Sequence, residues 1–165
     1  MPIVLHRTAE VFVDASTVDL VGESLVAEFE PDWNLNGLAE SDPDGEGVRI
    51  ICGQETGVVD VTCELWDQPA PLQAASWQDI AEISAHWTSS YLDFGTTTQD
   101  DPACRLPLPA AGSYRVRVHG THRDGDDPRP DSAPRETYLV QLWAAPPDGP
   151  TSLKSTSAFA ASWRA

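Results

Sequence analysis

Strict two-residue alternation of apolar and polar side chains is the feature that most restricts how this chain folds. Residues 114–120 read YRVRVHG, and apolar and basic side chains alternate there in the order Tyr114, Arg115, Val116, Arg117, Val118 and His119. Successive side chains of a β-strand point to opposite faces, so the pattern predicts a strand with one apolar and one basic face.

Comparable alternation recurs along the chain at intervals of roughly ten residues. We predict strands in segments 9–15, 24–30, 48–52, 58–66, 76–87, 90–95, 114–119 and 137–143. Ser76 and Asp79 would also suit a helix capping box, but the alternation through residues 81–87 favours a strand. We expect 48–52 and 58–66 to form a hairpin, and 90–95 to pair with 76–87.

Turn-forming residues separate these segments. Residues 31–47 are rich in Pro, Gly, Asp and Asn and are expected to be a connection, with a turn at Asn36-Gly37. Another long loop is expected between the strands at 114–119 and 137–143. The sequence predicts an all-β, single-domain antiparallel β-sandwich of about seven or eight strands in residues 1–150, followed by a loosely attached C-terminal extension in residues 151–165.

Charge restricts the possible partners. The chain of 165 residues has 26 acidic and 10 basic residues, a formal net charge of -16, and a hydrophobic fraction of 41%, which is sufficient for a folded core. This balance disfavours binding to nucleic acid or to anionic membranes and favours a basic partner. Residues 1–104 hold 20 of the acidic residues and only two basic ones, so the negative potential belongs to that part.

Three cysteines, Cys52, Cys63 and Cys104, lie in apolar or strand-like contexts without metal-ligand spacing. We expect buried free thiols, and an odd number of them places the protein in the cytoplasm.

Two segments invite a metal or catalytic interpretation. Residues 32–37 (DWNLNG) match the first half of a calcium loop, and residues 40–45 repeat the pattern, but Pro43 and Ile51 occupy the positions of the closing glutamate. A plain Asn-Gly turn is therefore favoured. Residues 119–127 (HGTHRDGDD) are interpreted as a solvated loop, because this His-x-x-His pair lacks a helical face. No nucleophile elbow or phosphate loop is present, so we predict no catalytic residue, cofactor or metal.

The basic face of the strand at 114–119 is the remaining candidate site. If this strand pairs with 137–143, then Arg115, Arg117, Gln141 and Trp143 share an exposed outer face, and arginine with tryptophan is typical of contact surfaces. The alternative is that the two arginines pair with the protein's own carboxylates on neighbouring strands.

Several segments resemble those of known proteins. The segments WNLNGL, GVVDVTCELWDQP, WQDIAEIS, LPLPAAGSYRVRVHGTHRD and ETYLVQLWAAPP, in this order, resemble a group of uncharacterised proteins from high-GC bacteria. The closing pattern of Leu-Pro, Gly, Tyr-x-x-x-x and a Tyr-containing final strand is similar to the competence protein J family, β-sandwich inhibitors of a bacterial nuclease. This second resemblance implies an inhibitor or immunity-type role.

The leading hypothesis is a non-enzymatic, cytoplasmic protein-binding module that inhibits a basic nuclease or toxin, with Arg115, Arg117, Gln141 and Trp143 as contact residues. The alternative is a ligand-binding β-sandwich for sugar or calcium that uses exposed tryptophans and the acidic loop 32–46. A hydrolase ranks third.

Overall fold

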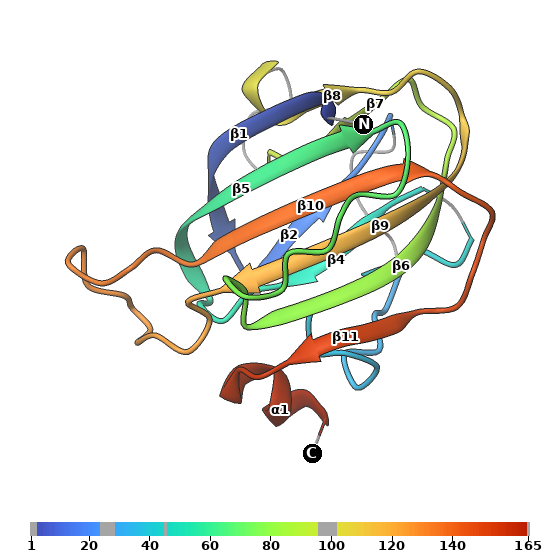
Figure 1. Ribbon diagram of the computed structural model, residues 1–165. Coiled ribbons are helices and arrows are strands. Elements are labelled where there is room, and N and C mark those ends of the chain that lie inside the picture. Colours follow the sequence, from blue (N-terminus) through green and yellow to red (C-terminus); the bar gives the residue numbers. More distant parts are fainter. Residues whose placement is uncertain (1–2, 24–28, 45, 96–101, 165) are drawn as a thin grey trace.

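Strands dominate the computed structural model, which describes residues 3–23, 29–44, 46–95 and 102–164 (Figure 1). The elements are, in chain order, β1 (Ile3–Asp14), β2 (Thr17–Leu20), β3 (Ala39–Ser41), β4 (Val48–Ile51), β5 (Thr56–Trp66), β6 (Asp79–Trp87), β7 (Tyr91–Asp93), the 3-10 turn η1 (Pro102–Cys104), β8 (Arg105–Pro107), β9 (Gly112–Thr121), β10 (Thr137–Ala144), β11 (Thr151–Ser155) and α1 (Ala158–Arg164). In this part of the chain no helix is long and apolar enough to cross a lipid bilayer.

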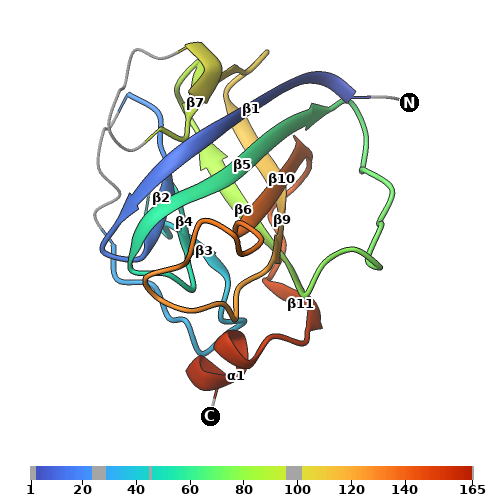
Figure 2. The same ribbon diagram turned by 90° about the vertical axis from the view of Figure 1, so that its left-hand side faces the viewer.

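Nine strands form one mixed sheet in the order β11-β6-β9-β10-β5-β1-β2-β4-β3, and β7 and β8 form a small second sheet. The sheet curls on itself, as Figure 2 shows, so that β3 approaches β6. The chain is all-β as predicted. The expected purely antiparallel arrangement is wrong, because β10 runs parallel to β5, and a sandwich of seven or eight strands is not confirmed, since nine strands of the described residues form one curled sheet. β10 is antiparallel to β9 on one side and parallel to β5 on the other. Side-chain alternation within a strand does not show which strand lies beside it or in which direction that neighbour runs.

The concave side of the curled sheet holds the core. Tyr138, Val140 and Leu142 of β10 face inwards with Val116 and Val118 of β9, as the alternation predicted. The three cysteines are free and buried, which confirms the expectation from the sequence. Residues 79–87 form a strand and not a helix, and that prediction is also confirmed.

Two predicted strand pairings are wrong. β4 does not form a hairpin with β5: it pairs with β2 and β3, while β5 lies between β1 and β10. The reason is that β2 turns away after the tight β1–β2 connection, where only Asp14 and Thr17 are paired, and it takes β4 with it. β7 pairs with β8 instead of β6.

The polar segment 31–47 is less irregular than predicted, since it contains β3. Gly37 has a φ of 67°, as expected for an Asn-Gly turn. The predicted strand 24–30 lies mostly outside the described residues. The long connection between β9 and β10, residues 122–136, has no helix or strand, in agreement with the prediction.

The expectation of a loose C-terminal extension is wrong, because residues 151–164 dock onto the sheet. β11 pairs with the edge strand β6, and α1 follows it below the sheet in Figure 1. Ser157 is buried and donates its hydroxyl to Asp79 Oδ2 at 2.6 Å, and the backbone amides of Thr156 and Ser157 donate to Asp79 Oδ1. These hydrogen bonds hold the C-terminal segment against the sheet, although its composition alone does not predict an ordered structure.

A buried ion pair lies beneath this segment. The Arg123 guanidinium, only 1% exposed, donates to Asp79 Oδ2 at 2.5 Å and to the carbonyl oxygens of Gly37 and Ile51 at 2.8 Å. Burial alone raises the pKa of Asp79, but hydrogen bonds from Ser157 and Arg123 outweigh it and bring that pKa below its usual value. The carboxylate is therefore charged and fully bonded.

The same network extends to the far end of the 122–136 connection. Arg123 Nε donates to the Tyr138 hydroxyl at 3.2 Å, and this hydroxyl donates to the fully buried Glu136. The backbone amides of Gly53 and Gln54 donate to Glu136 at 2.7 and 3.1 Å. Both ends of the connection are thus held by buried charges.

We predict that Asp79→Asn lowers the free energy of unfolding by about 3–5 kcal/mol, because it leaves the buried Arg123 without its counter-charge. Urea unfolding at pH 7 measures the change. Glu10→Gln is the control, since Glu10 is 68% exposed beside Arg135 and an exposed pair contributes about 0–1 kcal/mol. Equal losses in the two variants would contradict the structural role of the pair.

Candidate partner-binding surface

The strands at 114–119 and 137–143 pair, so the face considered in the sequence analysis exists. Arg117 lies opposite Gln141 and Arg115 opposite Trp143, so all four side chains share the outer face of β9 and β10. The expectation that this face is exposed is wrong. The exposed fraction is 7% for Arg115, Arg117 and Gln141, and 5% for Trp143.

Two segments cover these side chains. The connection between β5 and β6 crosses in front of β10 and β9 in Figure 1, where Ala70 accepts a hydrogen bond of 2.9 Å from Arg117 Nη1. In the same connection the Trp77 ring lies 5.3 Å from the His119 ring, centroid to centroid. The segment after β10 covers Arg115, which donates to the carbonyl oxygens of Asp148 and Gly149 at 3.1 and 2.9 Å.

One carboxylate serves both arginines. Glu82 of the neighbouring strand β6 accepts from Arg115 Nε at 3.1 Å and from Arg117 Nε at 2.9 Å. Arg117 also lies 4.9 Å from the centre of the Trp143 ring. The geometry therefore supports the alternative interpretation of the sequence, in which these arginines form ion pairs with a carboxylate of the protein itself. A contact role for the four residues remains a prediction that requires the covering segments to move.

The other half of the outer face, over β1 and β5, is open. Along β1 the outward side chains are all exposed, and along β5 they are exposed or partly exposed. We call this surface the β1–β5 face, and its outward residues are Val4, His6, Thr8, Glu10, Phe12 and Asp14 of β1 and Thr56, Val58, Asp60, Thr62, Glu64 and Trp66 of β5.

Strand register groups the side chains of the β1–β5 face by chemistry. Phe12 lies opposite Val58, with exposed fractions of 43% and 36%, and forms an apolar patch. The next outward pair is Glu10 opposite Asp60. Arg135 approaches both carboxylates, at 3.3 and 3.0 Å, and reduces their repulsion. Asp14 lies on the other side of the apolar patch, next to Phe12, and Glu64 lies farther along β5, opposite His6.

Sequence reasoning missed this surface. The alternation in β1 placed Phe12 and Glu10 on one side, but nothing in the pattern shows that β1 pairs with β5 over eleven positions. The exposed Phe12, on the polar side of an alternating strand, is the signal that could have drawn attention to it.

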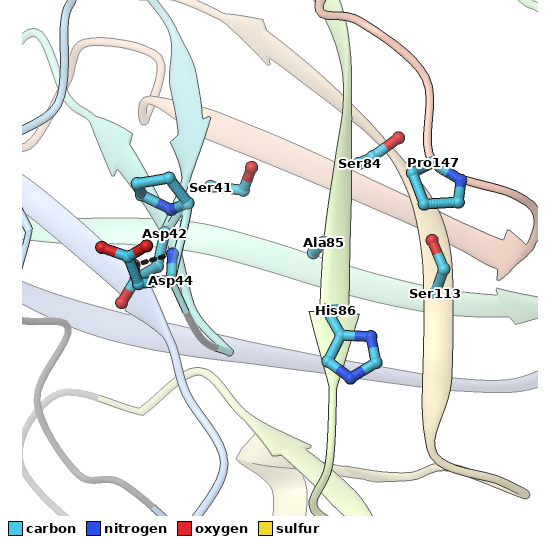
Figure 3. Close-up of a pocket in the computed structure, with 9 residues that line it drawn as sticks. Ser41, Asp42, Asp44, Ser84, Ala85, His86, Ser113 and Pro147 are labelled. Atoms are coloured by element: carbon cyan, nitrogen blue, oxygen red, sulfur yellow. Dashed lines mark hydrogen bonds between the residues drawn. The ribbon is translucent and has the colours of Figure 1, made fainter.

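A shallow groove of about 320 Å³ opens elsewhere, where the end of β3 approaches β6 (Figure 3). Asp42 and Asp44 lie on one side of it, and Ser84 and His86 on the other. Asp42 Oδ1 accepts a hydrogen bond from the Asp44 backbone amide at 2.9 Å. No hydrogen bond joins the carboxylates to the imidazole within the described residues, so the groove lacks the aligned acid, base and nucleophile of a hydrolase.

The acidic loop 32–46 uses its candidate calcium ligands internally. Asn36 Oδ1 accepts from the backbone amides of Leu38 and Ala39, and Asp32 Oδ1 accepts from Asn34. Nowhere in the described ranges do three or more His, Cys, Asp or Glu side chains gather as a metal site would require. The ring centroids of Trp33 and of Trp163 in α1 lie 6.4 Å apart, and the ring planes are tilted by 60°. The two rings therefore do not form a flat surface on which a sugar ring could stack.

Comparisons with known proteins concern the fold. No family model matches the chain, and no curated protein sequence matches it. The structure of ComJ from Bacillus subtilis, an inhibitor of the DNA-degrading activity of NucA, is similar with a TM-score of 0.58 at 11% identity, over 84% of this chain and 96% of that one. The crocagin biosynthetic gene J protein is similar with a TM-score of 0.51 at 18% identity, over 86% and 99%. The first likeness supports the distant resemblance to competence protein J that the sequence indicated.

We predict a pH-dependent stability from the covered face. Burial and the nearby charge of Arg117 together lower the pKa of His119 from 6.5 to about 4, although a hydrogen bond to the Leu139 carbonyl oxygen acts in the opposite direction. Since the folded pKa lies below the unfolded one, the contribution is complete above pH 6.5 and is lost as the pH falls towards 4.

Between pH 7 and 4.5, His119→Gln should therefore lose about 2–3 kcal/mol less unfolding free energy than the wild type. Urea unfolding at the two pH values measures this difference. His86→Gln is the control, because His86 is exposed and lies away from the covered face. Equal losses in wild type and His119→Gln would refute the assignment.

Proposed function

We propose that the protein is a non-enzymatic binding protein that inhibits a basic protein, such as a nuclease or toxin. The observation that carries this proposal is the β1–β5 face, where the carboxylates of Asp14, Glu10 and Asp60 flank the exposed pair Phe12 and Val58. An apolar centre with a polar rim is the usual anatomy of a protein interface. A sugar or calcium ligand remains the alternative from the sequence, without comparable geometric support.

Electrostatics supports a basic partner. The net charge of -16 attracts a cationic protein over long range, and the carboxylates of the β1–β5 face orient it at short range. Such complementarity raises the association rate more than it slows dissociation. Three buried free thiols are stable in a reducing compartment, so the proposal places the protein in the cytoplasm.

The likeness to ComJ supports the class of function. ComJ inhibits the DNA-degrading activity of NucA, and the similarity extends over most of both chains. At 11% identity the comparison concerns the fold, so the identity of the partner and its contact residues belong to the proposal.

The test is inhibition by purified components. Proteins captured on the immobilised chain at low salt and eluted with salt are identified, and basic nucleases and toxins among them are purified. The proposal expects one of them to lose its activity when mixed with an equimolar amount of this protein. Retained activity in every mixture, together with specific binding on a glycan array, would favour the sugar-binding alternative.

We predict that Glu10→Lys with Asp60→Lys slows association with that partner at least tenfold at low ionic strength. The change should nearly vanish at about 1 M salt, where the screening length is about 3 Å. Stopped-flow or surface-binding kinetics over a salt series measures the rates, and melting curves verify that the variant is folded.

Glu23→Lys with Glu30→Lys is the matched control. It alters the net charge by the same amount at exposed positions outside β1 and β5. A clearly smaller effect is expected, because only short-range steering depends on position. If the two double variants are equally slow, the partner responds to overall charge and the β1–β5 face is not the docking site.

A further inference from the structure

A cavity of about 450 Å³ lies between the 122–136 connection and the beginning of β5. One wall is formed by Gln54, Thr56, Gly57 and Val58, and the other by residues 128–131, Ala133 and Arg135. Val58 also belongs to the β1–β5 face, so the cavity borders that surface. Two of its lining side chains, Gln54 and Arg129, are buried and incompletely bonded.

Gln54 contributes an unused acceptor. The residue is 4% exposed, and its amide Nε2 donates to the Thr56 carbonyl oxygen at 3.3 Å, which fixes the orientation of the side-chain amide. Its Oε1 is buried and has no hydrogen-bond partner among the described residues. Buried side-chain oxygens are usually bonded, so this atom indicates a missing donor.

Arg129 contributes unused donors. Its side chain is 6% exposed, and Nη1 donates to the carbonyl oxygens of His122 and Pro134 at 2.7 and 3.2 Å. Nε and Nη2 are buried without a hydrogen bond to any described group. Nη2 lies 3.6 Å from Glu136 Oε1, too far for a hydrogen bond. The guanidinium therefore has charge compensation, while two N–H donors lack an acceptor.

The loop is shaped around this guanidinium. A Cβ atom at Gly125 would lie only 2.6 Å from Arg129 Nη2, so the loop backbone passes close to the guanidinium there. Glu136 Oε1 accepts from the backbone amide of Gln54 and is also the atom near Arg129. The free acceptor and the free donors therefore belong to residues that meet at one carboxylate oxygen.

The chemistry of these groups selects the ligand. A carboxylate would bond to Arg129 but would face Glu136 and leave Gln54 Oε1 without a donor. An ammonium group would bond to Gln54 but would lie near the positive charge of Arg129. A carboxamide has an N–H donor and a carbonyl acceptor and adds no charge to the pair of Arg129 and Glu136.

We propose that this cavity binds a neutral carboxamide, with its N–H on Gln54 Oε1 and its oxygen on the Nε–Nη2 edge of Arg129. The carboxamide belongs to an asparagine or glutamine side chain or to a peptide group. This inference stands on the cavity alone and does not depend on the proposed inhibitor function.

The experiment is an NMR titration of the 15N-labelled full chain, observing the Arg129 Nε–H and Gln54 side-chain amide signals. Three probes are compared: acetyl-Gly-Gln-Gly N-methylamide and its counterparts with Glu or Gly at the centre, so that only the Gln peptide contains a primary carboxamide. We expect saturable shifts of both signals with the Gln peptide at roughly millimolar concentration, and binding at least tenfold weaker for the Glu and Gly peptides.

The other outcomes are also decisive. Equal affinity for all three peptides supports the site and identifies the peptide group as the ligand. Tightest binding by the Glu peptide overturns the proposal in favour of an anion site. The absence of saturable shifts up to about 10 mM, well above the expected millimolar range, overturns it too.

Two variants test the residues. Arg129→Lys keeps the charge but removes the two-donor edge, and it should weaken binding of the Gln peptide at least tenfold. Arg135→Gln is the matched control, because Arg135 lines the same cavity but is engaged with Glu10 and Asp60, and it should leave the affinity within twofold. Unchanged affinity in a folded Arg129→Lys protein would refute the site. If that variant does not fold, the three wild-type titrations still decide.

Discussion

The buried guanidinium of Arg123 is the interaction on which the rest of the structure depends. It contacts Asp79 at the beginning of β6, the Gly37 turn before β3, the end of β4 at Ile51, and Tyr138 on β10. A buried cation without these partners would be very costly, so they must assemble together. Asp79 in turn holds the C-terminal segment through Ser157. One residue thereby links segments that are distant in the chain, and it constrains how the sheet curls.

Local features were predictable from the sequence, whereas features that depend on distant segments were not. Alternation was sufficient to place Val116, Val118 and Val140 in the core, because side-chain direction is a local property of a strand. The parallel pairing of β10 with β5 and the docking of β11 depend on chain paths that no local pattern encodes. The candidate site shows the same division: Arg117 and Gln141 lie on one face as expected, but their predicted exposure was wrong because residues 67–78 cross over them.

The two halves of the outer face therefore have different roles. Over β9 the two arginines share the carboxylate of Glu82 and are shielded from solvent, and their remaining N–H groups bind backbone oxygens of the covering segments. Over β1 and β5, Arg135 pairs with Glu10 and Asp60, and the carboxylates remain at the surface. The asymmetry concentrates the negative field of the protein on one half of the sheet, where an apolar patch is also available.

The anchoring of the 122–136 connection has an evolutionary consequence. Arg123 and Glu136 fix its two ends in the interior, so the residues between them can change without altering the distance that the loop must close. Lengthening an anchored loop is inexpensive, since each doubling of its length costs only about 0.6 kcal/mol of closure entropy. The middle of this connection is therefore the part of the fold where new recognition properties can arise by insertion or substitution while the strands beneath it keep their sequence.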